Sequence, residues 1–370
     1  MKLIYFDNAA TTPMDLMVVE KMSEVMKTVF GNASSVHSLG NIARDSIENS
    51  RLQIAELLNI STSELFFTSG ATEAINTIIF GAVKALSVEH IISSKLEHAA
   101  VIEAIKEVQY ENKIEVSNVN FDEKGQINLL HLKQLLSTPR KTLVCLMHVN
   151  NEIGNILPLT EVANICKENN ALFFSDTVQS VGKYKKIPLS ILDFAVASAH
   201  KFHGPKGVGF MYINSRNKIP PLLKGGHQER NMRSGTENLA GIVGMAEALQ
   251  LAFDNIDKDA KYILDLKNLL VEKLSSEIPD LVFNGDKDGH YSILNIGLPK
   301  ISHNSMVINN LDVNGIAVSG GSACSSGVMS ISHVIVNLNK AEKFLPIRIS
   351  LSKYNTVDEI NTFVNVLKKY

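Results

Sequence analysis

Short apolar segments alternate with amphipathic helical patterns between about residue 50 and residue 250. The segments ELFFTSG, HIISSK and ALFFSDTV have the composition of buried strands, and ATEAINTIIFGAVKAL and HAAVIEAIKEVQY between them have helical spacing. Buried strands separated by helices of this length predict a mostly parallel α/β sheet with helices on both faces. Such sheets bind ligands in the crevice at the carboxyl ends of their strands.

The pattern changes near residue 255. The stretches IVGMAEALQLAFDNI and AKYILDLKNLLVEKLSSEI predict two long helices, because their apolar residues recur at three- and four-residue spacing. Shorter strand-like segments follow, and VDEINTFVNVLKKY predicts a final amphipathic helix. The sequence therefore predicts a large α/β domain and a smaller α+β domain, with no repeat or flexible linker between them.

The charge and cysteine content exclude several classes of protein. A net charge of −2 without basic blocks argues against a nucleic-acid footprint or a membrane-surface patch. The beginning of the chain, MKLIYFDNAATTP, lacks the apolar core of a signal peptide. Three cysteines do not form a disulfide framework, so we expect a reducing cytoplasm, with Cys145 and Cys166 as small buried apolar residues.

Lys201 follows the strand-like segment DFAVASAH, which places its amine at the ligand-binding edge of the predicted sheet. A lysine near apolar or cationic groups loses proton affinity and can form an imine with a carbonyl. Asp176 follows another strand and would lie at the same edge. An imine-forming lysine and a carboxylate that can hold a protonated pyridine nitrogen are what pyridoxal 5'-phosphate requires. Taken alone, Lys201 also fits a surface lysine beside a Gly-Pro turn, and Asp176 a helix cap or an ion-pair partner.

The histidines around Lys201 are less suited to a metal. His200 and His203 are three residues apart in a predicted turn, and no acidic residue lies between them. Metal-binding sites in proteins need a fuller set of ligands than this pair provides. The sequence therefore predicts no resident metal ion.

An anion site is predicted where TSGATEAIN begins a helix. The unpaired N–H groups and the dipole at a helix N-terminus favour a phosphate, although a glycine at such a position is common in proteins. Ala71 and Thr72 lie in this first turn, and Ser198 and His200 could add donors.

Three further side chains follow or lie within predicted strands. His98 could stack on a flat ring, or could simply cap a helix. Asn151 follows another strand. Arg348 lies within the apolar strand PIRISLS, where a bidentate acidic partner such as a substrate carboxylate would suit it.

Cys324 lies among glycines and serines in SGGSACSSG. A loop of this composition gives a thiol access and freedom to move, with little packing. A reactive thiol needs a lowered pKa, and His333 is one residue that could provide it. Taken alone, Cys324 fits a free loop thiol without chemistry better than a reactive one.

Nine motifs in order resemble the cysteine desulfurases of the NifS/IscS type, and they extend over nearly the whole chain. They are YFDNAATTP, TSGATEAIN, EHAAV, HVNNEIG, DTVQSVGK, SAHKFHGPKG, GGHQERNMRSGTEN, SGGSACSSG and IRISLS. The resemblance implies a class V aminotransferase fold, that of PLP-dependent transferases of fold type I. It places residues 15–255 in a large domain that binds the cofactor, and residues 1–14 and 256–370 in a small domain that carries the Cys324 loop.

The resemblance also implies the residue roles. Lys201 would form the imine with pyridoxal phosphate, and His98 would stack on the ring and act in proton transfer. Asp176 would hold the pyridine nitrogen and Gln179 the ring hydroxyl. The remaining assignments are phosphate contacts by Ala71, Thr72, Ser198 and His200, a contact from Thr236 to the neighbouring subunit's phosphate in a homodimer, and recognition of the substrate carboxylate by Asn151 and Arg348.

The implied reaction converts L-cysteine to L-alanine and leaves the sulfur on Cys324 as a persulfide. The acceptor would be an iron–sulfur scaffold protein or a tRNA-thiolating enzyme, and Cys324 could share an Fe–S cluster with such a scaffold. The sequence departs from the usual pattern at Ser330 and Ile331, where many relatives have Glu-Pro, and at His227 and Ser352, where glycine is usual. Three alternatives remain: a selenocysteine lyase, a class V aminotransferase with a non-catalytic thiol, and a non-enzymatic protein with a cofactor fold.

Overall fold

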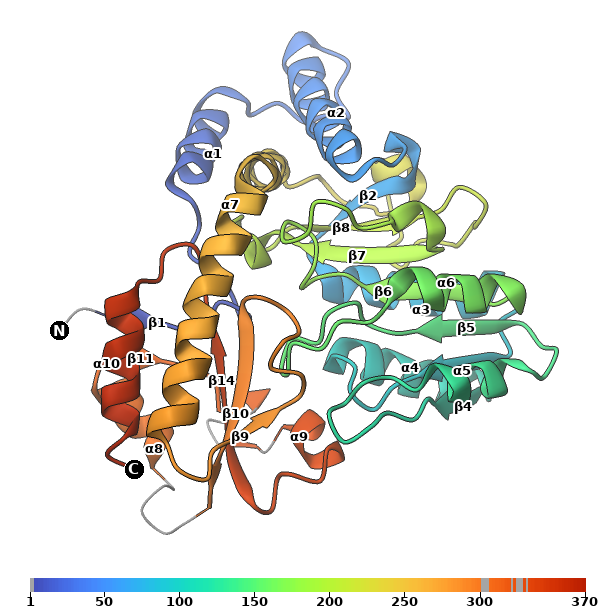
Figure 1. Ribbon diagram of the computed structural model, residues 1–370. Coiled ribbons are helices and arrows are strands. Elements are labelled where there is room, and N and C mark those ends of the chain that lie inside the picture. The colour runs from blue at the N-terminus through green and yellow to red at the C-terminus, as the bar shows by residue number, and fades with distance from the viewer. Residues whose placement is uncertain (1–2, 301–305, 321, 324–328, 331) are drawn as a thin grey trace.

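A mixed, mostly parallel sheet forms the centre of the larger domain (Figure 1). The structure is a computed structural model that describes residues 3–300, 306–320, 322–323, 329–330 and 332–370. Within these residues the sheet has seven strands in the order β2-β8-β7-β6-β5-β3-β4, and β8 alone runs antiparallel to its neighbours. The strands are β2 (Leu65–Thr68), β3 (His90–Ser93), β4 (Glu115–Asn118), β5 (Thr142–Cys145), β6 (Leu172–Asp176), β7 (Phe194–Ser198) and β8 (Gly209–Ile213).

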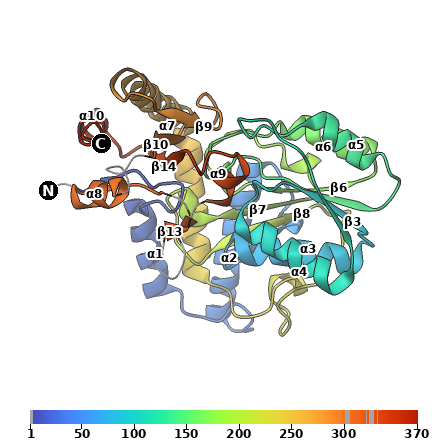
Figure 2. The ribbon, with the colours of Figure 1, turned by 90° about the horizontal axis from the view of Figure 1, so that it is seen from below.

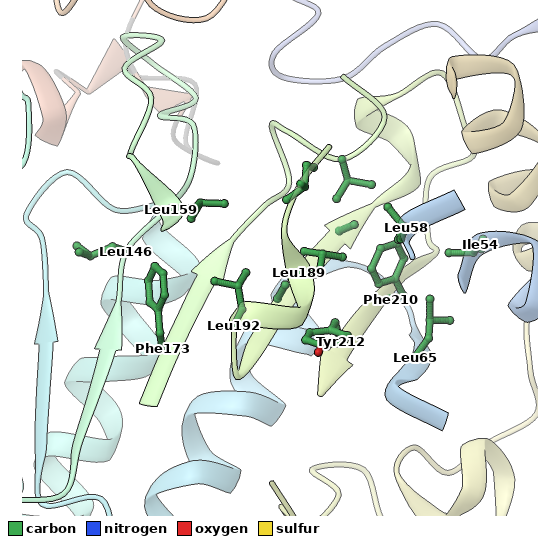
Figure 3. Close-up of a cluster of buried hydrophobic side chains, with 14 of the residues drawn as sticks. Ile54, Leu58, Leu65, Leu146, Leu159, Phe173, Leu189, Leu192, Phe210 and Tyr212 are labelled. Atoms are coloured by element: carbon green, nitrogen blue, oxygen red, sulfur yellow. The ribbon is translucent and has the colours of Figure 1, made fainter. Parts of the chain in front are cut away.

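Helices cover both faces of this sheet, as the view from below shows (Figure 2). One face carries α3 (Ala71–Ala85) and α4 (Ala99–Asn112), whose apolar residues form one core with alternate residues of the strands. The other face carries α5 (Leu129–Leu136) and α6 (Leu159–Glu168), and its core also includes residues of α2 (Ser38–Leu58). Figure 3 shows part of this second core, where Phe173, Phe210 and Tyr212 of the strands lie among leucine and isoleucine side chains. Most strand residues are buried on both faces, which explains their continuous apolar runs.

The smaller domain is built around a three-stranded antiparallel sheet in the order β14-β10-β9. The chain's beginning joins it, because β1 pairs in parallel with β11. The elements of this domain are β1 (Ile4–Tyr5), β9 (Val282–Asn284), β10 (Ile293–Pro299), α8 (Val307–Val313), β11 (Ile316–Ala317), β12 (Ser322–Ala323), β13 (Met329–Ser330), α9 (His333–Asn337), β14 (Phe344–Ser350) and α10 (Val357–Leu367). Short 3-10 turns complete the described chain: η1 (Thr62–Glu64), η2 (Leu189–Ile191), η3 (Ala199–Lys201) and η4 (Gln228–Asn231).

Helix α7 (Leu239–Glu277) joins the two domains as one continuous element of 39 residues. Its first half packs in the core of the large domain and against α1 (Leu16–Thr28), whereas its second half packs in the core of the small domain. The prediction of two separate helices here was therefore wrong, because no helix-breaking residue separates the two apolar patterns. The predicted domain boundary near residue 255 falls within this helix, and the division of the chain stays a prediction.

Helix α7 also meets the length and hydropathy criteria for a membrane span, the one helix to do so among the described residues, but half of its most apolar window is buried in the protein. The predicted fold class, an α/β protein with a smaller α+β domain, is confirmed. Cys145 and Cys166 are both buried and free, as the apolar runs around them predicted.

Candidate active site

A cavity of about 200 Å³ lies at the carboxyl ends of the central strands. These ends face the sheet of the small domain, where β10 and β14 lie (Figure 1). The cavity is lined by Ala71, Thr72, Ile75, His98, Met147, Val149, Asn151, Asp176, Val178, Gln179, Ser198, His200 and Lys201. The structure thus brings together nine residues that the sequence assigned to a cofactor site.

Lys201 reaches the cavity from η3, directly after β7. Its Nζ donates to the carbonyl oxygens of Ala9 and Ala10, both at 2.7 Å, so the N-terminal segment fixes the position of the amine. Burial lowers the pKa of Lys201 to about 8, and Arg348 adds to this effect, whereas Asp176 and Asp7 oppose it. An amine with this pKa is partly neutral near neutral pH and can act as a nucleophile or a base.

Asp176 ends β6 and is buried at the same cavity. Burial raises the pKa of its carboxyl, while His98, the N–H of Val178 and Lys201 act in the opposite direction. The Val178 N–H donates to Oδ1 at 3.0 Å, and no lysine or arginine forms a salt bridge with Asp176 among the residues described. A buried carboxylate in this position favours a cationic ligand group, which is what a protonated pyridine nitrogen would provide.

The N-terminus of α3 forms another wall of the cavity. Gly70 is its N-cap with φ of 152°, a conformation that glycine adopts without strain, and the N-cap residue provides no side-chain hydrogen bond to the helix. The Ala71 N–H donates to Oγ of Ser198 at 2.8 Å, which brings the end of β7 to the helix terminus. Unpaired N–H groups with hydroxyl groups beside them suit a phosphate.

His98 and His200 lie at the cavity with different partners. Nδ1 of His98 caps α4 by accepting from the Ala100 N–H at 3.1 Å, so its role as a helix cap and its place in the cavity occur together. Nδ1 of His200 lies 3.1 Å from Oγ1 of Thr11. Burial lowers the pKa of His200 to about 4, with smaller effects of Lys201 and Lys206, so its ring is neutral at neutral pH.

Gln179 is buried at the cavity and is held on both sides of its carboxamide. Nε2 donates to the Ala9 carbonyl at 2.9 Å, and Oε1 accepts from Nζ of Lys183 at 2.6 Å. The Ala9 carbonyl therefore receives a hydrogen bond from Gln179 and another from Lys201. One backbone carbonyl thus helps to position both the Gln179 amide and the Lys201 amine.

Arg348 lies in β14, at the side of the site that the small domain provides. Its Nη2 donates to Oδ1 of Asp7 at 2.8 Å and to Oγ of Ser319 at 2.9 Å, and Nη1 donates to the Asn151 carbonyl at 3.1 Å. Its Nε is buried without a hydrogen-bond partner among the described residues. The guanidinium is thus fixed beside Asn151, which lines the cavity, and retains a donor for an acid.

Two predicted residues lie elsewhere, and a third is not among the described residues. Thr236 is exposed and lines a separate hollow with Arg233 and Glu237, away from the cavity. Nε2 of His333 lies 2.9 Å from the Glu97 carbonyl, at the start of α9. Cys324 lies outside the described residues.

Sequence reasoning missed three charged residues around the site. Lys183 and Asp7 belong to motifs that the sequence singled out, but their partners become visible only in the fold. Glu97 precedes His98 and is buried; its Oε1 accepts from the Met147 N–H at 3.1 Å. Burial raises the pKa of Glu97 well above its usual range, the Met147 N–H acts against this shift, and Asp176 adds to it. The available signal was a charged residue in the loop that follows a strand-like segment.

Comparison with known proteins gives a consistent result. The family model described as aminotransferase class-V matches residues 4–363. A cysteine desulfurase IscS from Dictyoglomus turgidum is 38% identical over 375 residues, which cover 99% of this chain and 94% of the relative.

Two solved structures are similar over almost the whole chain. A structure described as a NifS-like protein has a TM-score of 0.91 and 35% identity, with 100% of this chain and 99% of that chain covered. A structure of SspA in complex with cysteine has a TM-score of 0.81 and 28% identity, with 95% of this chain and 100% of that chain covered.

Proposed function

This chain belongs to the class-V aminotransferase family and, within it, to the cysteine desulfurases of the NifS/IscS type, and from that premise we propose that it uses pyridoxal 5'-phosphate on Lys201 to convert L-cysteine to L-alanine. The family depends on this cofactor in general. One observation carries the proposal for this chain: an amine of lowered pKa, a buried carboxylate and an uncapped helix N-terminus line a single cavity.

The residues fit the chemistry of the cofactor. Lys201 would bind its aldehyde carbon, Asp176 would keep its ring nitrogen protonated, and Gln179 would donate to its ring oxygen. When bound, the cofactor supplies a ring that accepts electrons from the substrate's Cα. The phosphate would be held by Ala71, Thr72, Ser198 and His200, and the ring would stack on His98.

Lys201 is also the base that we assign to the Cα proton. A free Lys201 amine with a pKa of about 8 is partly neutral near neutral pH and could take up this proton. The carbonyls of Ala9 and Ala10 keep Nζ at the cavity during this step. His98, which also lines the cavity, would assist proton transfer.

Arg348 and Asn151 would bind the substrate carboxylate. The Asn151 carbonyl holds Nη1 of Arg348, and Asp7 and Ser319 hold Nη2, so the guanidinium needs little reorganisation. Preorganised donors lose less entropy on binding than mobile ones.

Cys324 would receive the sulfur. Its thiolate attacks the sulfur of the bound substrate, a sulfur–sulfur bond forms, and the carbon–sulfur bond breaks with its electron pair left on the substrate carbon. The persulfide would pass to an acceptor protein in the cytoplasm, either an iron–sulfur scaffold or a tRNA-thiolating enzyme.

We further propose a homodimer. Helices α1 and α2 and the segment between them expose large apolar side chains: Leu16 is 76% exposed, Met26 62%, Phe30 76% and Val36 93%. Apolar surface of this extent favours burial against another protein surface. In such a dimer, the exposed Thr236 would reach the phosphate bound by the partner.

The test combines three measurements on purified protein. Incubation with L-cysteine should form L-alanine, mass spectrometry should find one added sulfur on Cys324, and borohydride should fix the cofactor covalently on Lys201. Cys324→Ser should abolish sulfur transfer. Alanine formation that is unaffected by Cys324→Ser would instead favour an aminotransferase-type enzyme with a non-catalytic thiol.

A further inference from the structure

Lys183 lies in the turn that follows β6. Its ammonium does not line the cavity but contacts Gln179, which does. Nζ donates to Oε1 of Gln179 at 2.6 Å, and the Lys183 carbonyl accepts from the Tyr291 hydroxyl at 3.2 Å. No carboxylate forms a salt bridge with Lys183 in the part of the chain that the structure describes. Its closest polar partner is therefore a neutral amide that lines the cavity.

The surroundings of Lys183 disfavour its charge. Burial lowers the pKa of Lys183 to about 7, and the nearby cations Lys201 and Arg348 act in the same direction. Burial likewise lowers the pKa of His290, and the charge of Lys183 adds to that shift. A cation held among other cations without an acid destabilises the folded chain. Such a residue at a cavity is a candidate for a functional role.

The contact with Lys183 determines how the Gln179 carboxamide lies. A lysine ammonium has donors only, so it must face the amide oxygen. The Ala9 carbonyl is an acceptor and faces Nε2 at 2.9 Å, so both contacts favour the same orientation. Nε2 carries two hydrogens, and one goes to Ala9. The other N–H is left to donate to a group in the cavity.

We propose that Lys183 is a positioning residue for the cofactor: it holds the Gln179 amide nitrogen toward the cofactor's ring oxygen. This inference rests on the proposed function, which supplies the ring oxygen as the acceptor. Lys183 acts through Gln179 and does not itself contact the reacting atoms.

The experiment measures the affinity of the apoprotein for pyridoxal 5'-phosphate by absorption titration. Lys183→Met keeps the length of the side chain but removes its charge and its donors, and it should weaken binding about tenfold, the effect expected for a lost hydrogen bond to a charged group. Lys183→Gln keeps a donor without a charge and should recover part of the loss. Lys185→Met is the matched control, because Lys185 is exposed and pairs only weakly with Asp257 at 3.4 Å; it should bind within twofold of the unchanged protein.

A double-mutant cycle tests whether Lys183 acts through Gln179. In a Gln179→Leu background, Lys183→Met should cause less than a twofold further loss. A tenfold loss that persists in this background, or wild-type affinity in Lys183→Met itself, would overturn the inference. The apoprotein of Lys183→Met should melt at the same or a higher temperature at pH 6, and a lower melting temperature would assign Lys183 to the fold instead. If the unchanged apoprotein bound no pyridoxal phosphate, the proposed function would fail first.

Discussion

The two walls of the active-site cavity are built in different ways. The wall of the large domain consists of residues at the ends of neighbouring strands, such as Asp176 after β6 and Lys201 after β7. The second wall adjoins the cavity through the contact between Arg348 and Asn151 and is not part of the lining itself. It consists of Asp7, Ser319 and Arg348, which come from three segments of the small domain; Asp7 is separated from Arg348 by 341 positions. The first wall depends on local strand-end geometry, and the second depends on contacts between distant parts of the chain.

The two walls also differ in the task that each serves, which is the chemical step for the first and substrate binding for the second. The large-domain wall holds groups whose ionisation is altered by burial, as in Lys201 and Asp176. In the small-domain wall, one arginine is held by hydrogen bonds to Asp7, Ser319 and the Asn151 carbonyl. Changes in the first wall should therefore alter the chemical step, and changes in the second should mainly alter substrate binding.

The largest effect is expected for Lys201→Ala. Removing the amine takes away both the cofactor attachment and the base, so alanine formation should fall about 10³-fold or more. The apoprotein should unfold at an unchanged or higher temperature, because a buried amine disfavoured by its surroundings is lost. Alanine production in a fixed-time assay measures the first effect. The control is Lys206→Ala, which changes an exposed lysine five residues away. An equal loss of alanine formation in this variant would contradict the assignment of the chemical step to Lys201.

A smaller loss is expected for Asp176→Asn. The asparagine oxygen can still accept from the Val178 N–H, but the side chain no longer stabilises a protonated ring nitrogen. We expect kcat to fall about 100-fold, as is typical when a preorganised electrostatic group is removed. Steady-state kinetics with saturating cofactor measure this change. If only KM rose, Asp176 would belong functionally with the substrate-binding wall.

Asp7→Asn should affect the second wall. It weakens a charge-assisted hydrogen bond to Arg348, so KM for L-cysteine should rise about tenfold while kcat changes less than about threefold. Steady-state kinetics give the ratio of the change in KM to the change in kcat, which distinguishes the tasks of the two walls. Asp45→Asn, on the exposed face of α2, is the control. A fall in kcat at constant KM would show that Asp7 acts on Lys201 rather than through Arg348.

The smallest effect concerns the pH dependence of stability. The pKa of Lys183 is lowered from 10.5 to about 7 by folding, so the folded chain binds fewer protons than the unfolded chain between these values. The destabilisation is therefore complete below pH 7 and disappears as the pH rises toward 10.5. Lys183→Met should raise the melting temperature of the apoprotein by about 1–3 °C at pH 6 and by less at pH 9. An equal gain at both pH values would mean that packing, not charge, causes it.

The sequence predicted the large-domain wall well because local patterns encode it. An apolar strand followed by a polar residue places that residue at the carboxyl edge of the sheet, and this rule located both Asp176 and Lys201. The order of the strands and the antiparallel direction of β8 depend on long-range pairing and did not follow from these patterns.

The roles of Asp7 and Lys183 escaped prediction for a related reason. Both residues lie in motifs that the sequence singled out, but Asp7 acquires its partner from β14, and Lys183 acquires its cationic neighbours Lys201 and Arg348 only through long-range packing. Helix α7 shows the same limit at the level of secondary structure. Two apolar patterns predicted two helices, because the patterns do not reveal that successive faces of one helix serve different cores.

Helix α7 has a mechanical consequence for the whole molecule. At 1.5 Å per residue, its 39 residues follow an axis about 58 Å long, and this axis bends between the part in the large domain and the part in the small domain (Figures 1 and 2). It contains no proline, and beyond Gly244 it contains no glycine, so it lacks the residues at which helices usually kink. A hinge at the point where α7 passes from the large domain to the small domain would have to break backbone hydrogen bonds. Small adjustments between the two walls can come from side chains and short loops, whereas a larger movement of one domain would have to change the bend of this helix.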